Sequence, residues 1–163
     1  MQRLKDLNVN DSDAIYLKLW LQLAKSSKAI EQEMEARFQK NFKQSMSRFD
    51  VLSQLDRCDP EWLPMGRLAN QLIASKGNIT RLVDRMIGEG LIDRRPSPED
   101  RRIIQVGITD KGRTLFKEMA IAHAQWSKSL LGALDLKHGK QLLSLLVKVN
   151  KAFAAGIDCQ DVD

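Results

Sequence analysis

Apolar residues recur at helical spacing over most of this chain, beginning with a long stretch near its start. From Ser12 to about Phe42 there is almost no helix-breaking residue, so one long helix is predicted, with Asp11 or Ser12 as its candidate N-cap. The first half of this helix is apolar on more than one face, which exceeds what a helix on the surface of a monomer needs. We therefore expect another element to cover the additional face.

Two shorter helices are predicted next. The second helix is expected to start at Ser47, with Asp50 placed for a capping-box-like contact, and to reach the Asp59-Pro60 turn. A third helix should span roughly Pro64 to Ile73, with its apolar side chains turned inward.

A fourth helix follows a tight turn near Ala74 and completes a helix-turn-helix arrangement. Ser75 is its expected N-cap, and Gly88-Glu89-Gly90 should end it. Its apolar side chains fall on one face, namely Ile79, Leu82, Val83, Met86 and Ile87.

A β-hairpin is predicted directly after the fourth helix. Leu91 to Arg95 form its first strand, PSPED its turn, and Arg102 to Ile108 its second strand, along which apolar and other side chains alternate. Thr109 is expected to cap a long helix, and a last amphipathic helix should run roughly from Lys137 to Ala155. The predicted fold class is mainly α with a small β-hairpin.

The composition is that of a globular protein. A chain of 163 residues with 43% hydrophobic and 29% charged residues can bury a core as one compact domain or two closely joined ones. It has no run of about 18 apolar residues and no signal-peptide-like start, so a cytoplasmic protein without membrane contact is expected. Neither the cysteines, Cys58 and Cys159, nor the histidines have metal-ligand spacing. We expect no structural disulfide, no metal site and no cofactor.

The cations are unevenly distributed by type. Between Arg67 and Arg113 there are eight arginines and two lysines, whereas the rest of the chain has four arginines and twelve lysines. Arginine presents a planar fork of donors that fits phosphate oxygens and guanine edges in pairs, which lysine cannot do. With a net charge of +5, this favours recognition of an acidic partner by the middle segment, although an arginine-rich solvated surface remains the alternative.

The face of the fourth helix opposite its apolar side chains is predicted to be exposed. Steps of about 100° place Gly77, Arg81, Asp84 and Arg85 there, with Asn78 and Thr80 on the flanks. Arg81 and Arg85 repel each other as an i,i+4 pair unless an acidic group such as Asp84 or Glu89 relieves them. The helix start lacks the Glu of a capping box, which leaves its positive end and Lys76 available for a phosphate or a base.

Four arginines flank the Pro-rich turn of the hairpin, in the sequence RRPSPEDRR. Pro96 and Pro98 should stiffen this turn, which lowers the entropy lost when arginines are immobilised on DNA. We interpret the hairpin as the wing of a winged helix-turn-helix, whose fourth helix occupies the major groove. The predicted DNA-contacting residues are Ser75, Lys76, Gly77, Asn78, Thr80, Arg81, Arg85, Arg95, Asp100, Arg101 and Arg102.

The run from Leu68 to Gly112 resembles the winged helix-turn-helix core of the MarR family of bacterial transcriptional regulators. The similarity rests on TRLVDRM, then GLI, then the Asp-x-Arg of the wing at Asp100 and Arg102, then ITDKG. It implies a homodimer in which the first and last helices of both subunits interlock. Residues 1–44 and 113–163 would then form the dimerisation region, and residues 45–112 the DNA-binding domain.

The resemblance also implies roles for single residues. Arg102 would insert into the minor groove, with Asp100 holding its side chain in position, while the segment from Ser75 to Arg85 would make the major-groove contacts. Each dimer would bind a palindromic operator in double-stranded DNA, with repression as the family's more common mode.

Many members of this family release DNA when a small anionic or aromatic molecule fills a crevice beside the DNA-binding lobe. An aromatic acid or its coenzyme A thioester would be such an effector. The residues that could line a crevice of this kind are Trp20, Phe38, Phe42, His123 and Trp126, with Arg37 and Arg48 as anion partners. For each aromatic residue, packing in the core is the alternative.

Three other functions are alternatives to that of a DNA-binding regulator. An enzyme is disfavoured, because no nucleophile with its base, phosphate loop or metal constellation is evident, and Glu99-Asp100 lies among arginines that would keep both ionised. A protein-interaction module of the same fold predicts an exposed face without cations, unlike that of Arg81 and Arg85. A regulator that senses oxidants through Cys58 is a further alternative, with a bystander thiol favoured.

Overall fold

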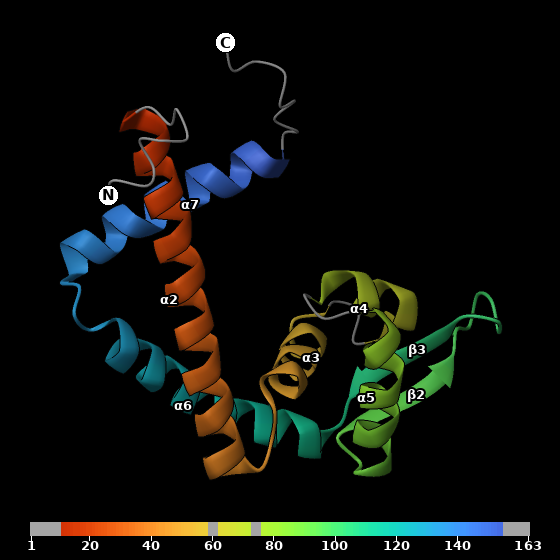
Figure 1. The fold of residues 1–163 in the computed structure, drawn as a ribbon. Coiled ribbons are helices and arrows are strands. Elements are labelled where there is room, and N and C mark those ends of the chain that lie inside the picture. Colours follow the sequence, from red (N-terminus) through yellow and green to blue (C-terminus); the bar gives the residue numbers. More distant parts are fainter. Residues whose placement is uncertain (1–10, 59–61, 73–75, 155–163) are drawn as a thin grey trace. The chain divides into compact units, whose positions relative to one another are not determined.

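The structure of the protein is a computed structural model that describes residues 11–58, 62–72 and 76–154 (Figure 1). The chain divides into two compact units, Met1–His123 and Ala124–Asp163, which are described separately. The fold is mainly helical with a small antiparallel sheet, as predicted.

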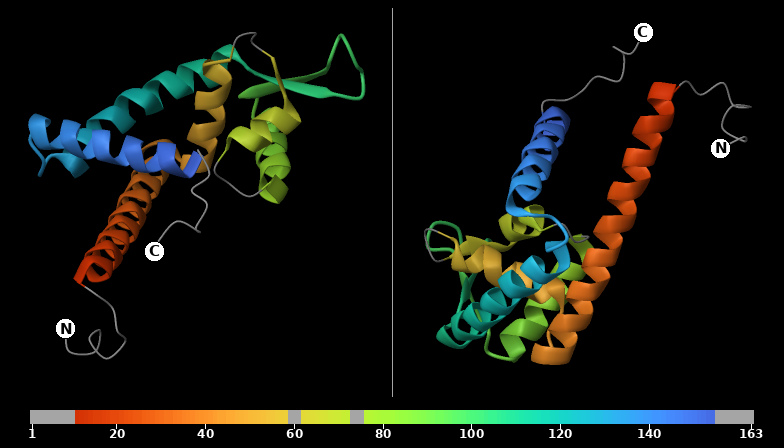
Figure 2. Two further views of the ribbon diagram at one scale, coloured as in Figure 1. Left: turned by 90° about the horizontal axis from the view of Figure 1, so that it is seen from above. Right: turned by 90° about the vertical axis from the view of Figure 1, so that its left-hand side faces the viewer.

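Helix α2, Asp11–Phe42, confirms the long first helix. In its second half Met34 and Phe38 are buried, whereas the apolar side chains of its first half are exposed within the protomer. Figure 2 shows that this first half extends beyond α3, α4 and α5. Among the exposed apolar residues are Ile15, Tyr16, Leu19, Trp20 and Leu23.

Helix α3, Met46–Asp56, starts one residue earlier than predicted, and its cap is different. The N-cap is Ser45, whose hydroxyl accepts a hydrogen bond from the Arg48 N–H at 3.3 Å. The Glu35 carboxylate of α2 accepts a second one from the Met46 N–H at 2.7 Å. The predicted cap at Ser47 is therefore wrong, because Ser45 has the extended backbone of a cap and α2 supplies the carboxylate expected from Asp50.

The sheet has three strands in the order β1-β3-β2, namely β1 Leu63–Pro64, β2 Ile92–Pro96 and β3 Ile104–Ile108. The hairpin of β2 and β3 was predicted, with Arg95 opposite Gln105 in the observed register. Strand β1 was not, because two residues show no alternation. Pro64 pairs with Gln105 as an edge residue, where a proline is tolerated, so α4 begins at Met65 and not at Pro64.

Helices α4, Met65–Gln71, and α5, Lys76–Gly88, form the helix-turn-helix, and α4 ends before the predicted Ile73. The C-terminus of α5 is a Schellman motif. Gly90 has φ +70° and donates to the Ile87 carbonyl at 2.9 Å, while Leu91 donates to the Met86 carbonyl at 2.9 Å. This confirms the predicted end of the helix.

One buried cluster joins α3, α4, α5 and the sheet. It packs α5 against the sheet and so fixes the position of the wing relative to the helix. Its members are Val51, Leu52, Leu55, Leu63, Leu68, Ile79, Val83, Met86, Leu91, Ile92 and Val106.

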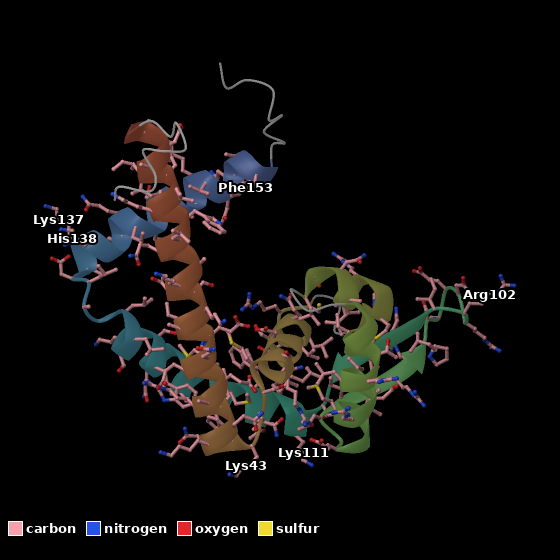
Figure 3. All side chains as sticks on the ribbon, viewed as in Figure 1. Lys43, Arg102, Lys111, Lys137, His138 and Phe153 are labelled. Carbon is pink, nitrogen blue, oxygen red and sulfur yellow. The ribbon has the colours of Figure 1, made fainter. Side chains whose placement is uncertain are left out.

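Helix α6, Asp110–Leu131, is capped as predicted by Thr109, whose hydroxyl accepts from the Gly112 N–H at 3.0 Å. Helix α7, Leu136–Ala154, belongs to the second unit and matches the predicted last helix. Its Leu143, Leu145 and Phe153 are exposed within the protomer, and Figure 3 labels Phe153 near the end of the helix. Within the described ranges, no helix is both long and apolar enough to span a membrane.

Candidate nucleic-acid interface

Helix α5 has one buried and one exposed face. Ile79, Val83 and Met86 are buried, and Leu82 and Ile87 are partly buried. The exposed positions are Thr80, Arg81, Asp84 and Arg85. The predicted orientation of the helix is therefore confirmed for its described side chains.

The two arginines of this face, Arg81 and Arg85, are not neutralised by their acidic neighbours. The Asp84 carboxylate faces Arg94 of β2, with 3.6 Å between Oδ1 and Nη1, and Glu89 pairs with Arg48 of α3. Among the described residues, neither guanidinium has a hydrogen-bond or ion-pair partner. Their mutual repulsion costs a few tenths of a kcal/mol, roughly, and an external anion would remove it.

The predicted contacts at the start of α5 are only partly described. Lys76, Gly77 and Asn78 lie in the first turn of the helix, but their side chains fall outside the described part of the chain, as does Ser75 entirely. Their roles remain predictions.

The wing turn is held by its own backbone and by the Asp100 side chain. The Ser97 N–H donates to the Ile103 carbonyl at 2.8 Å, which extends the hairpin beyond β2 and β3. The Asp100 carboxylate accepts from the Arg102 N–H at 2.9 Å, and the Asp100 carbonyl accepts from the Ile103 N–H at 2.9 Å. Asp100 thus shapes the backbone at the tip, from which the Arg102 side chain projects (Figure 3).

Arg95 lies on the opposite face of the sheet from Arg94 and has two partners. Its guanidinium carbon lies 4.2 Å from the centre of the Trp62 ring, and its Nε donates to the Gln105 amide oxygen at 3.1 Å. Sequence reasoning missed Trp62. Its contact with Arg95 depends on the pairing of β1 with β3, which no local sequence pattern predicts.

The segment 45–104, which contains α3, α4, α5, β2 and the wing turn, matches the model of the MarR family. Over this segment the chain is similar to the MarR family. A curated relative is the uncharacterized HTH-type transcriptional regulator YhbI of Bacillus subtilis, 30% identical over 88 residues. These residues are 54% of this chain and 57% of YhbI, so the matched part spans just over half of that relative.

Solved structures of transcriptional regulators share the fold of this chain. BldR from Sulfolobus solfataricus has a TM-score of 0.74 and 26% identity, covering 90% of this chain and 99% of BldR. Sco3205 from Streptomyces coelicolor, a MarR-family regulator solved in complex with DNA, has a TM-score of 0.76 and 19% identity. That likeness covers 92% of each chain and concerns the fold alone.

An aromatic cluster lies where α2, α3 and α6 meet. The Phe38 ring is fully buried, and its centre is 5.0 Å from that of Phe49 and 5.7 Å from that of His123. The centre of the Phe42 ring lies 6.4 Å from that of Phe38. Burial raises the pKa of the nearby Asp50 carboxyl, and the charge of His123 opposes this more weakly.

The structure gathers only some of the predicted effector-binding residues. Phe38, Phe42 and His123 come together, although Phe38 is part of the packed core. Arg37 pairs with Glu33 at 2.7 Å on α2. Trp20 lies in the exposed first half of α2, 62% exposed, and Trp126 belongs to the second unit.

Proposed function

We propose that this chain is a sequence-specific DNA-binding transcriptional regulator. The observation that carries the proposal is the pair Arg81 and Arg85 on α5, exposed and without partners among the described residues, together with Arg102 at the tip of the wing. Unpaired arginines on one helix face are mildly destabilising in isolation and become favourable when phosphates or guanines cover them. The DNA complex of Sco3205, which has the same fold, supports this reading.

In this proposal α5 lies in the major groove and the wing contacts a flanking groove. The arginine forks of α5 donate to base edges or phosphates, and Arg102 inserts into the minor groove. Asp100 contributes by fixing the backbone of the turn, since its carboxylate binds the Arg102 N–H. The guanidinium is thereby directed outward without being neutralised.

The DNA-binding form is a homodimer. The exposed apolar side chains of α2 and of α7 are each more than a monomer needs, and a second copy of the chain would cover them. A dimer with twofold symmetry presents two copies of α5, so its operator is palindromic.

The regulator acts as a repressor that a small anionic or aromatic ligand, such as an aromatic acid or its coenzyme A thioester, releases from DNA. Support comes from the corner between α2 and α3, where Gln44 Oε1 and Arg48 Nε are buried with no hydrogen-bond partner among the described residues. Buried polar atoms of this kind are costly unless another group satisfies them. The aromatic cluster of Phe38, Phe42 and His123 would supply the apolar side of the site.

An interaction module without DNA binding is the second candidate. The exposed cations of α5 and the wing argue against it, and Arg102→Ala tests the choice. If the chain binds DNA as proposed, Arg102→Ala should lower the affinity for the operator at least tenfold while the protein remains dimeric. Lys117→Ala, which removes the charge of an exposed residue of α6, should have little effect. Equal binding by Arg102→Ala and Lys117→Ala would refute the wing assignment.

A further inference from the structure

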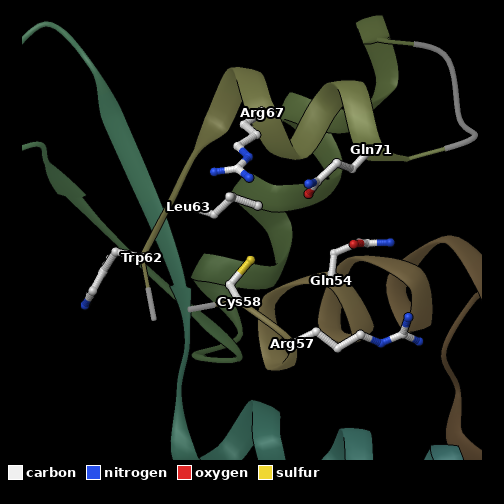
Figure 4. Close-up of a pocket in the computed structure, with 7 residues that line it drawn as sticks. All are labelled: Gln54, Arg57, Cys58, Trp62, Leu63, Arg67 and Gln71. Carbon is white, nitrogen blue, oxygen red and sulfur yellow. The ribbon is translucent and has the colours of Figure 1, made fainter. Parts of the chain in front are cut away.

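A pocket of about 200 Å³ lies between α3, α4 and β1, apart from the aromatic cluster (Figure 4). Gln54, Arg57 and Cys58 come from α3 and its end, Trp62 and Leu63 from β1 and the residue before it, and Arg67 and Gln71 from α4. The proposed DNA contacts do not use any of these residues.

Most polar side chains that line this pocket have no partner among the described residues. Among the described residues, the side chains of Arg67, Gln71 and Gln54 make no hydrogen bond or ion pair, while Arg57 donates to the Ser53 hydroxyl at 2.8 Å. Arg67 and Gln71 reach down from α4 toward the space above Cys58 (Figure 4). Two of the described lining residues are arginines, whose guanidinium groups can donate to an anion.

The size and shape of the pocket narrow the choice of anion. Sites for drug-sized molecules occupy about 300–1,000 Å³, so a pocket of about 200 Å³ suits a smaller molecule. A planar carboxylate matches the arginine fork in a bidentate pair. Leu63 offers an apolar wall for a short hydrocarbon part.

Trp62 connects the edge of this pocket to the wing. Strand β3 lies between β1 and β2, yet the Trp62 ring reaches Arg95 of β2, with 4.2 Å between the ring centre and the guanidinium carbon. The ring must therefore cross β3 near Gly107, where no side chain obstructs it. A shift of Trp62 would move its cation–π partner on the wing.

We infer that this pocket binds a small organic carboxylate through Arg67 and Gln71, and that occupancy changes the position of Arg95 through Trp62. The binding site stands independently of the proposed function. Its effect on DNA rests on that function.

Binding is tested on the full chain with Trp20→Phe and Trp126→Phe, which leaves Trp62 as the only tryptophan. Titration with sodium benzoate or butyrate should give a saturable change in Trp62 fluorescence within about 10 mM, and neutral methyl benzoate should not. Adding Arg67→Gln should raise the Kd at least tenfold, while adding Lys117→Gln should leave it unchanged. Absence of saturation, or equal Kd values for both variants, overturns the site.

Inorganic phosphate separates a carboxylate site from a DNA-phosphate contact. The inferred site prefers the carboxylates. Phosphate alone could give the saturable change, and Arg67→Gln could weaken DNA binding without any ligand. Both results together would mean that the pocket contacts the phosphate backbone of DNA, and the carboxylate inference would be wrong.

The coupling is measured by fluorescence anisotropy on a selected duplex. Saturating benzoate should weaken DNA binding by the wild type about fivefold or more, and should have no effect on the already weaker binding of Arg95→Ala. The same loss in both proteins overturns the coupling but not the site. If the wild type binds no duplex, the proposed function fails, and the fluorescence titration still decides whether the pocket binds carboxylates.

Discussion

Gly112 of α6 lies directly against the carbonyl oxygen of Leu91, so closely that a Cβ at Gly112 would be 2.1 Å from that oxygen. The same junction is held by the Thr109 hydroxyl, which donates to the Gly90 carbonyl at 2.8 Å, and by the Thr109 N–H, which donates to the Leu91 carbonyl at 3.2 Å. The end of α5, the base of the wing and the start of α6 are thereby joined at one point.

Gly112→Ala should lower the free energy of unfolding by about 1–3 kcal/mol, because the methyl group forces the backbone of Leu91 away. Gly139→Ala in α7 is the matched control. A Cβ there meets nothing within 4 Å, so stability should stay the same or rise by up to about 1 kcal/mol. Urea denaturation measures both, and similar values for the two variants would show that the junction is not tightly packed.

Arg81→Lys should separate the reading of bases from the contact with phosphates. Lysine keeps the charge but lacks the planar fork, so discrimination between the operator and a scrambled duplex should fall by about 1–3 kcal/mol, with the salt dependence nearly unchanged. Anisotropy at several salt concentrations measures both quantities. Unchanged discrimination would mean that Arg81 contacts only the backbone.

Trp20→Glu should convert the proposed dimer to monomers, because it places a charge on the exposed apolar face of α2. Lys25→Glu changes an exposed residue of the same helix, and we expect it to stay dimeric. Light scattering after size-exclusion chromatography measures the mass. If the Trp20→Glu protein stays dimeric, the first half of α2 is not part of the dimer interface.

Asp50→Asn should stabilise the protein at neutral pH. Burial raises the pKa of the Asp50 carboxyl in the folded state, so its contribution to stability is fully present below the unfolded pKa and is lost as pH rises through the folded pKa. The gain from asparagine should therefore be largest at neutral pH and vanish in acid. Thermal unfolding across pH, with Asp93→Asn on the exposed part of β2 as control, tests this, and a gain that grows in acid would contradict it.

The features that could be predicted from the sequence depend on neighbouring residues. The buried stripe of α5 follows from helical spacing, and its end follows from Gly90, which takes the left-handed conformation of a Schellman motif. The Thr109 cap of α6 is equally local.

The features that were missed depend on contacts between distant segments. Glu35 caps α3 from 11 positions earlier, and β1 exists only through its pairing with β3. Asp84 was a candidate to relieve the arginines of α5, but it turns to Arg94 of β2 instead. The periodicity of the sequence does not predict these contacts, because they depend on how distant segments pack together.

The central claim, that this chain is a dimeric reader of a specific DNA sequence, is tested most directly by selecting bound duplexes from a random library. Anisotropy of the wild type and of Arg102→Ala on the enriched duplex and a scrambled one then measures selectivity. We predict an enriched palindrome, bound at least 1,000-fold more tightly, roughly, than the scrambled duplex, with a steep salt dependence and a clear loss in Arg102→Ala. No enrichment, with equally weak binding to both duplexes, would contradict the claim.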